Sequence, residues 1–441
     1  MTAKSWGWGV ALVGILPFAD GARADEPVRL QERFPVGYQY HVSTRVDLTG
    51  TLTPPAEKDR PAPKPLALSG DSAIEYDERV LAVAPDGRVT KTARSCRRMD
   101  FQRTVGDRPQ RTALRPEVRR LILLRHKNTE VPFSPDGPLT WGEIDLVRTD
   151  VFTPALTGLL PEGPVRAGDR WTATPAAVQE LTDMERIDEG KLECRLEGVE
   201  TRGTRRQAKV TFRGEVRGTN EDGPSRQQLQ GHFLFDLDGR YLNYLLLKGT
   251  HSLLEKDGRE VGRVEGRFAL ERQVRAAPEL SDAAVRHLTV EPNENNTQLL
   301  YDNPDLGVRF LYPRRWRVSG VRGSQVTLDT SDGSGLLLTL DTAARTPTGA
   351  QFLAESRGWL EKQKARLLRL DPPRRVRDNP PLEQFALEAE MGGQKFVMDY
   401  YVSRQAQGGA TLAARLPSGD VSALRREVER IAWSVTITRR Q

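Results

Sequence analysis

Apolar and polar residues alternate in short runs along residues 28–275, and Gly, Pro and Asp interrupt the runs. A period of two is typical of a β-strand that buries one face. Asp-Gly pairs at 86–87, 238–239 and 257–258 each separate two such runs, which is a strong hairpin signal. We therefore expect an antiparallel sheet, curved like half a barrel, over residues 25–276.

One segment, residues 139–160, departs from this period. Its apolar residues recur at close to helical spacing, and Leu160-Pro161 ends the pattern. They are Trp141, Ile144, Val147, Val151 and Leu156. We expect a helix that packs against the curved sheet, as in a half-barrel or an α+β sandwich.

The twelve residues LPEGPVRAGDRW, 160–171, follow directly. They resemble the Leu-Pro-x-x-x-Val-x-x-Gly-Asp-x-Trp signature of an uncharacterised exported bacterial β-rich family. In physical terms, Gly168-Asp169 is expected to form a turn, and Trp171 to start a strand and pack its indole under the sheet. The resemblance implies no catalytic residues.

The strand pattern stops near residue 276. Residues 277–300 contain Pro278 and Pro292 and end in a polar run, so we interpret them as a linker with one short helix at 281–288. Asn295-Asn296-Thr297 matches a glycosylation sequon, but such triplets are common by chance. A separate domain is expected over residues 301–441.

That second domain opens with LGVRFLYPRRWRV, 306–318. Val308, Phe310 and Tyr312 fall on one strand face, and Pro313 ends the pairing because it has no N–H. Trp316 then starts the next strand. Two interpretations are open for its indole: a core residue, or an exposed binding anchor flanked by arginines. The alternation with Phe310 and Tyr312 favours the core.

The rest of the domain alternates strands and helices. Two strands joined by SDGSG precede a helix with Thr348 as its cap. An apolar stripe extends that helix through Phe352, Trp359, Leu360, Leu367 and Leu370. Three further strands follow, with turns at Gly392-Gly393 and Gly408-Gly409. A last helix points Leu424, Val428 and Ile431 inward.

This order, with Phe-x-Tyr-Pro-x-x-Trp at its start and WSV at its end, resembles the PsbP-like α/β/α sandwich superfamily over residues 301–437. PsbP itself is an extrinsic subunit of the photosynthetic oxygen-evolving complex. Known members act mainly by binding and assembly, so the resemblance implies a non-enzymatic role. The fold class expected for the whole chain is α+β.

The N-terminus has the layout of a secretory signal peptide. A lysine precedes an apolar run at 8–18, and Ala22-Arg23-Ala24 offers a cleavage site before Asp25. The run is too short to span a bilayer, which takes about 20 residues. We expect residues 1–24 to be removed and the protein to be exported, to the periplasm or the medium, with no transmembrane segment.

Charge and candidate chemistry narrow the function classes. The net charge is +6, but basic and acidic residues are interleaved and no stacking aromatics accompany them, which argues against nucleic acid. The five histidines lack the sequence spacing of a metal-binding motif. They are His41, His126, His232, His251 and His287. His232 and His251 flank one hairpin and lack a third ligand. We assign no metal or cofactor residue.

Nucleophile motifs also fail. Ser72, in a Gly-Asp-Ser string, enters a strand, and no Asp-x-x-His follows it. The string at 333–337 lacks the final glycine of Gly-x-Ser-x-Gly. Cys96 and Cys194 are either one disulfide or two buried thiols. No catalytic residue is assigned, and the protein is predicted not to be an enzyme.

Two main functions stay open. The first is binding or assembly with an envelope protein, in an oligomeric state that the sequence leaves open. The second is carriage of a lipid or other apolar ligand in the half-barrel, and a hydrolase is a weaker third. The concave face of the hairpin at 234–253 should distinguish these two functions. A carrier needs this face to be apolar and open, whereas in a binding module side chains fill it.

Overall fold

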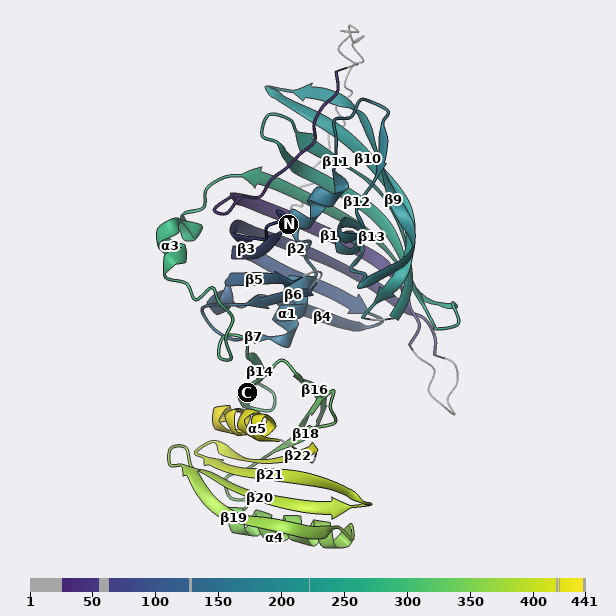
Figure 1. Ribbon diagram of the computed structural model, residues 1–441. Coiled ribbons are helices and arrows are strands. Elements are labelled where there is room, and N and C mark those ends of the chain that lie inside the picture. Colours follow the sequence, from purple (N-terminus) through teal and green to yellow (C-terminus); the bar gives the residue numbers. More distant parts are fainter. Residues whose placement is uncertain are drawn as a thin grey trace, which may run out of the picture.

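The computed structural model describes residues 26–54, 63–126, 129–221, 223–417, 419 and 421–438. The predicted signal peptide and its cleavage site lie outside these residues. Within them the chain is mostly β, with three sheets that are antiparallel apart from one parallel pair (Figure 1). The expected α+β class is therefore wrong. That prediction overestimated the helix content, because the helices are few and short whereas the largest sheet alone has twelve strands.

The largest sheet has the strand order β6-β5-β3-β2-β1-β13-β12-β11-β10-β9-β8, with β4 paired to β3. Its strands are β1 (Gln39–Leu52), β2 (Leu66–Val83), β3 (Val89–Val105), β4 (Arg108–Ala113), β5 (Arg120–His126), β6 (Thr129–Phe133), β8 (Arg170–Thr172), β9 (Arg186–Arg202), β10 (Arg205–Asn220), β11 (Gly223–Asp236), β12 (Tyr241–Leu254) and β13 (Glu260–Val274).

The predicted hairpins form, with one difference in a turn. Gly87 and Gly258 take the left-handed φ values of 86° and 85° that such turns require. In the β11–β12 turn, however, Arg240 takes the positive φ, 56°, in place of Gly239. The carboxylate of Asp236 accepts the N–H groups of residues 238 and 239 at 3.0 and 2.8 Å. This contact lengthens the turn and shifts the left-handed position by one residue.

Three short helices cover one face of this sheet: α1 (Trp141–Arg148), η2 (Thr153–Leu159) and α2 (Pro175–Thr182). We call them the plug helices, and the sheet face that they cover the core face. The helix expected over 139–160 breaks after Arg148, and a proline in the first turn starts the 3-10 helix η2. Thr140 and Glu143 form a capping box that fixes where α1 begins.

The contacts of one helix show that the core face is concave. This helix, α2, forms an ion pair with one strand and a hydrogen bond with another that lies far away in the sheet. Glu180 of α2 pairs with Arg125 of β5, while the carbonyl of Thr182 accepts from Gln227 of β11 at 2.6 Å. Six strand-to-strand steps separate β5 from β11, about 29 Å in a flat sheet. The eight residues of α2 measure about 12 Å. The sheet therefore curves around the plug helices.

The Gly168–Trp171 motif takes the local structure expected of it. Gly168 has a φ of 91° in a turn, and Trp171 lies in β8 with its ring packed on the core. The indole Nε1 donates to the carbonyl of Leu159 at 2.8 Å, which ties the motif to η2.

A second unit follows, with its own sheet in the order β16-β17-β18-β22-β21-β20-β19. Its elements are β16 (Trp316–Arg322), β17 (Gln325–Thr330), β18 (Gly335–Asp341), α4 (Gly349–Lys362), β19 (Arg366–Arg377), β20 (Leu382–Met391), β21 (Gln394–Gln405), β22 (Gly408–Pro417) and α5 (Ser422–Ser434). The helices α4 and α5 pack on opposite faces of the sheet (Figure 1).

A small third sheet joins the two units. It runs β23 (Thr436–Ile437), β15 (Val308–Tyr312), β14 (Leu299–Asn303) and β7 (Leu139–Thr140). The strand β7 comes from the first unit and pairs in parallel with β14, so that Leu139 faces Leu299. Both leucines are buried. The joint between the units is thus apolar and hydrogen-bonded.

The helix α4 begins as predicted, at a capping box on Thr348, but ends earlier. It was expected to reach Leu370. It stops at Lys362 because Lys364 adopts a left-handed φ of 55°. Leu367 and Leu370 then lie in β19, an edge strand that tolerates its two prolines. Trp359 stays 47% exposed.

Residues 277–300 hold η3 (Pro278–Leu280), a 3-10 helix, and α3 (Asp282–Arg286). Ala277 and Leu280 are buried against the first sheet, and Arg79 pairs with Asp282. The first part of the expected linker is therefore docked. Residues 291–295 are exposed, and Leu299 and Leu300 at the end of the expected linker are buried in β14. No helix among the described residues has the length and apolar character to cross a membrane.

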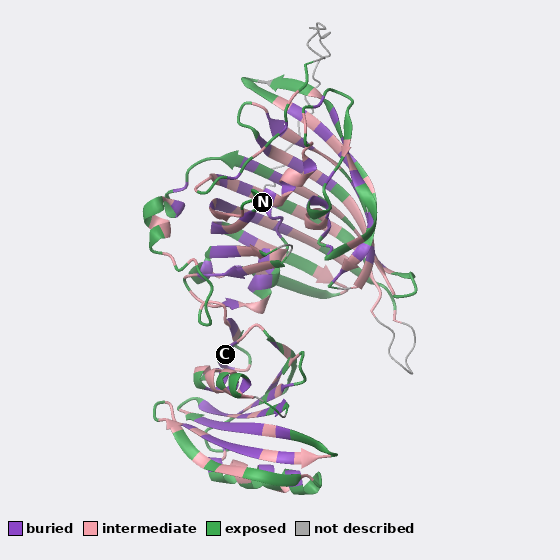
Figure 2. Ribbon diagram, viewed as in Figure 1, coloured by how far each residue is buried: buried purple, intermediate pink, exposed green. Residues whose placement is uncertain are grey.

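Trp316 belongs to the core. Its side chain is fully buried, and its Nε1 donates to Glu427 of α5 at 2.8 Å. Buried positions alternate along β15, the preceding strand in the chain. Buried and more exposed residues also alternate along the strands of the large sheet (Figure 2). The interpretation of Trp316 as an exposed anchor is therefore wrong.

We expect Trp316→Ala to lower the free energy of unfolding of the second unit by about 3–5 kcal/mol, because it leaves a cavity and removes the hydrogen bond to Glu427. Urea unfolding of the full chain, followed by circular dichroism, measures this. The control Trp359→Ala, at an exposed tryptophan, should change it by no more than about 0.5 kcal/mol. Equal effects of the two substitutions would contradict the packing described here.

Candidate functional site

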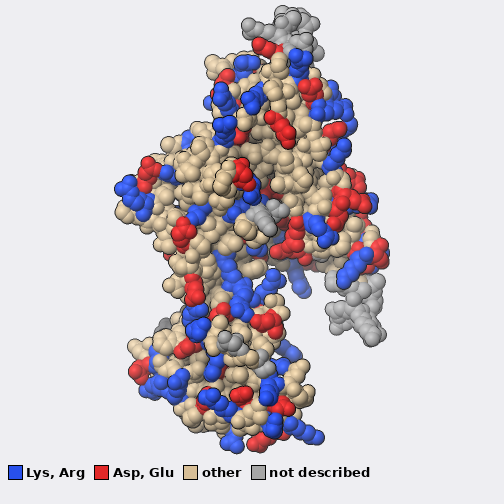
Figure 3. Space-filling view, in the orientation of Figure 1, with Lys and Arg blue, Asp and Glu red and all other residues tan. Residues whose placement is uncertain are grey.

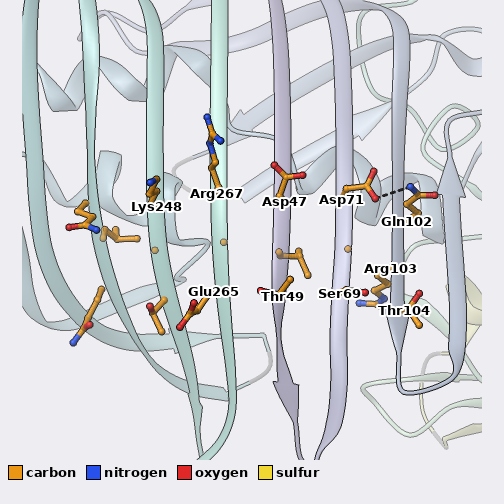
Figure 4. Close-up of a pocket in the computed structure, with 18 of the residues that line it drawn as sticks. Asp47, Thr49, Ser69, Asp71, Gln102, Arg103, Thr104, Lys248, Glu265 and Arg267 are labelled. Carbon is orange, nitrogen blue, oxygen red and sulfur yellow. Dashed lines mark hydrogen bonds between the residues drawn. The ribbon is translucent and has the colours of Figure 1, made fainter. Parts of the chain in front are cut away.

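A groove of about 1580 Å³ crosses the face of the large sheet that the plug helices leave free. We call it the outer groove. It spans nine neighbouring strands, from β9 through β13 and β1 to β4. Two rows of side chains form its walls (Figure 4). The first row is Glu193, Arg213, Gln230, Lys248, Arg267, Asp47, Asp71, Gln102 and Arg111, and the second is Lys191, Glu215, Gln228, Thr250, Glu265, Thr49, Ser69 and Thr104.

Strand register builds these rows. Asp47 stands directly opposite Arg267 on β13 and Asp71 on β2, and Lys248 stands opposite Arg267. Directly opposed residues point to the same face. Each row therefore continues from strand to strand while the alternate residues point into the core.

Between the rows the floor of the groove is backbone, and four glycines lie along it: Gly70, Gly214, Gly249 and Gly266. At Gly214 an added Cβ would lie 2.1 Å from the carbonyl oxygen of Lys191. Only glycine allows the close approach of β9 and β10 at this point.

The first row carries charges that the protein does not neutralise. Among the described residues, the side chains of Arg213, Lys248, Arg267 and Asp47 take part in no hydrogen bond or ion pair. Asp71 accepts only a neutral hydrogen bond, from Gln102 at 2.8 Å. The row thus has a basic part on β10–β13 and an acidic part on β1–β2.

Like charges also stand opposite each other in this row. Lys248 faces Arg267, and Asp47 faces Asp71. Directly opposed like charges destabilise a sheet. Local rules of this kind are broken most often where function requires it, so the row is the strongest candidate for a binding surface.

On the core face, side chains fill one end of the hairpin at 234–253. Phe235, Leu242 and Leu245 are buried there and belong to one cluster with Leu156 and Leu159 of η2. Near the other end, Leu253 is only half-buried.

The histidines do not come together. His232 pairs with Leu246 and His251 with Gln227, which places the two rings on opposite faces of the sheet. His41 lies 3.0 Å from Asp77 and contacts Arg275. No group of three metal-binding side chains occurs among the residues that the structure describes.

The other sequence candidates are also structural. Ser72 is buried in the middle of β2 and donates to the carbonyl of Asp100 at 3.0 Å. Residues 333–337 form the β17–β18 turn and the start of β18. Cys96 and Cys194 are free buried thiols on β3 and β9, which have six strands of the sheet between them. Burial raises the pKa of each thiol to about 12.

Sequence patterns missed a buried ionic network. Arg94 donates to Glu78 at 2.8 Å and to Asp150 at 2.9 Å, and Tyr40 donates to Glu78 at 2.6 Å. All four side chains are buried. Asp150 follows α1, so the network fastens the plug helices to β2 and β3. The only sign of this network in the sequence is that charged residues, Glu78 and Arg94, occupy strand positions that face the core.

Burial shifts two carboxyl groups near this network. It raises the pKa of Asp150 to about 6, against the attraction of Arg94. It raises the pKa of Glu130 to about 7, although Arg94 and Arg125 oppose the shift. Glu180 and Asp150 add to the upward shift at Glu130 by charge repulsion.

No protein-family model matches the chain, and no curated protein matches it. Many solved structures resemble parts of it, and the following three are among them. The Ran-binding protein Mog1p of Saccharomyces cerevisiae is 9% identical, covers 32% of this chain and 96% of its own, and has a TM-score of 0.27. Cyanobacterial PsbP of Synechocystis sp. PCC 6803 is 14% identical over 32% of this chain and 92% of its own, with a TM-score of 0.24.

The third structure is a lipovitellin, 10% identical over 66% of this chain and 29% of its own, with a TM-score of 0.33. At TM-scores below 0.5, no statement about fold or function rests on these likenesses. The PsbP-like resemblance of residues 301–437 stays a prediction. The exported β-rich family suggested by residues 160–171 stays a prediction.

The buried carboxyl of Glu130 predicts a pH dependence of stability. Its ordinary pKa is 4.5 and its folded pKa is about 7, so between these values the folded chain holds a proton that the unfolded chain has released. The stability that this group contributes is present below about pH 4.5 and falls as the pH rises to about 7, by up to about 3 kcal/mol.

Glu130→Gln removes this titration. The free energy of unfolding of the wild type should drop relative to that of Glu130→Gln as the pH rises from about 4.5 to 7. Urea titrations at several pH values measure the difference. Glu117→Gln, at an exposed carboxylate on η1 (Pro116–Val118), is the control. A difference that does not vary with pH would show that Glu130 titrates normally.

Proposed function

We propose that this chain is an exported, non-enzymatic binding protein of the cell envelope and that the outer groove receives a charged protein partner. The observation that carries the proposal is the row of unneutralised charges along the groove. A partner that fits would present carboxylates to Lys248 and Arg267 and basic groups to Asp47 and Asp71.

Electrostatics supports a protein partner at this surface. Charged groups across an interface are arranged so that opposite potentials meet, which raises the association rate and rejects wrong partners. On the face that Figure 3 shows, Lys and Arg lie among Asp and Glu, and many charged side chains are paired, such as Arg259 with Glu255 at 2.6 Å. The first row of the groove differs in that Arg213, Lys248, Arg267 and Asp47 form no such pair among the described residues.

Carriage of an apolar ligand receives less support. The walls of the outer groove are polar side chains, whereas sites for apolar ligands are lined mostly by apolar side chains. On the concave face, the hairpin side chains that such a ligand would touch are already packed against η2. Ser72 gives no support to a hydrolase, because its hydroxyl donates a hydrogen bond to a backbone carbonyl.

The cellular location rests on the sequence. Residues 1–24 have the features of a cleaved signal. The non-enzymatic role is what the PsbP-like resemblance implies.

The test places a photo-crosslinking residue at Gln230, inside the first row, and exposes the full chain to the envelope fraction of its source. The wild-type groove should cross-link one partner. Lys248→Glu/Arg267→Glu should reduce that product by about tenfold or more, because like charges then face the partner and each tenfold requires only about 1.4 kcal/mol. Raised salt should reduce it as well.

Lys256→Glu/Arg259→Glu makes the same change in net charge at the exposed tip of the β12–β13 hairpin and should leave the product unchanged. A product that survives the groove substitutions, or one that the hairpin-tip substitutions remove equally, would contradict the proposal.

A further inference from the structure

A second pocket, of about 830 Å³, lies at one end of the large sheet. The N-terminal residues 26–38 form one side. The hairpin tips β9–β10 and β11–β12 contribute Arg206 and Arg240. Arg29 and Arg33 complete a set of four guanidinium groups around the pocket. We call it the arginine pocket.

The N-terminal segment presents its arginines by alternation. Leu30 and Phe34 are buried in the core, and Glu32 turns inward to pair with the buried Arg272. Arg29 and Arg33 therefore point outward and are exposed. The carboxylate between them in the sequence is already committed to the core and does not neutralise them.

The four arginine side chains have no partner of their own. Among the described residues, none of them forms a hydrogen bond or an ion pair. Glu26 is the single acidic residue among those that line the pocket. Four cations around one cavity with one carboxylate repel one another and create a positive potential that an anion would relieve.

The backbone conformation of Arg240 is a second indication of a binding site. It holds a left-handed φ of 56°, while Gly239 beside it does not. A residue with a side chain costs roughly 1–2 kcal/mol in this conformation, and glycine would relieve that cost. Strained residues of this kind cluster at ligand-binding sites.

Tyr38 gives the pocket a neutral donor. Burial, followed by the charge of Glu32, raises the pKa of its phenol to about 12. The hydroxyl is protonated at neutral pH and can donate a hydrogen bond to an anion.

We propose that the arginine pocket binds a phosphate group of a multiply charged anion. The planar guanidinium offers paired donors that match phosphate oxygens in geometry and charge. This site is separate from the outer groove and goes beyond the proposed function. The phosphate belongs either to the headgroup of an anionic phospholipid or to a soluble phosphate ester.

The test measures binding of two probes to the full chain. The first is inositol hexakisphosphate, by calorimetry. The second is vesicles of phosphatidylcholine with and without phosphatidylglycerol, by flotation. Saturable binding of either probe supports the site, and the probe that binds identifies the source of the phosphate. Arg33→Gln/Arg206→Gln should weaken that binding by about a hundredfold, or about tenfold for each charge-assisted contact.

Arg240→Gly gives the sharpest result, because its two effects have opposite signs. It should weaken binding by about tenfold and raise the melting temperature by relieving the left-handed strain. Lys364→Gly is the matched control, since Lys364 is also a cation with a left-handed φ, 55°, and lies in the second unit. It should raise the melting temperature and leave binding unchanged.

Binding of neither probe, or binding that the arginine substitutions leave unchanged, would overturn the proposal. So would an equal loss with Lys364→Gly, which would indicate attraction to net charge alone. Lys248→Glu/Arg267→Glu should not alter binding of the probes, so the arginine pocket and the outer groove can fail separately.

Discussion

The contact of Arg94 with Glu78 and Asp150 is the interaction on which the first unit depends. All three charges are buried, and a buried charge is costly unless it is paired. Glu78 and Arg94 belong to the sheet and Asp150 to the plug helices. The charge of Asp150 is therefore paired only when the plug lies against the sheet. This requirement favours one placement of the plug on a face whose buried residues are mostly apolar.

The plug in turn decides where a partner can bind. Its helices occupy the concave face that would hold an apolar ligand in an open half-barrel. The surfaces left for recognition are the opposite face and the ends of the sheet. Both carry unpaired charge: the first row of the outer groove on the face, and the arginine pocket at the end. A filled core and charged outer surfaces together describe a binding protein better than a carrier.

Local signals in the sequence were reliable where neighbours in the chain determine structure. The Asp-Gly turns at 86–87 and 257–258, the cap at Thr348 and the buried Trp316 follow from residues only a few positions apart. The α+β class was wrong because strands far outnumber helices. The two long helices were wrong because α1 ends at Arg148, before Pro154 starts the 3-10 helix η2, and because the left-handed Lys364 follows the end of α4.

The outer groove could not be predicted, because its rows depend on register between strands far apart in the sequence. Asp47 meets Arg267 across β1 and β13, although 220 residues separate them in number. In the sequence each appears as an ordinary exposed residue of its own strand. The arginine pocket has the same origin, since it gathers residues 29, 33, 206 and 240 from three segments.

Native mass spectrometry of the protein purified with its co-purifying small molecules tests the central claim most directly, namely that the concave face is filled by its own side chains. Apart from any phosphate compound held at the arginine pocket, the account predicts the bare mass of the chain and no increase on incubation with a long-chain fatty acid. A lipid or fatty acid retained at one molecule per chain, and lost on replacing plug leucines such as Leu156 and Leu159 with larger residues, would contradict it.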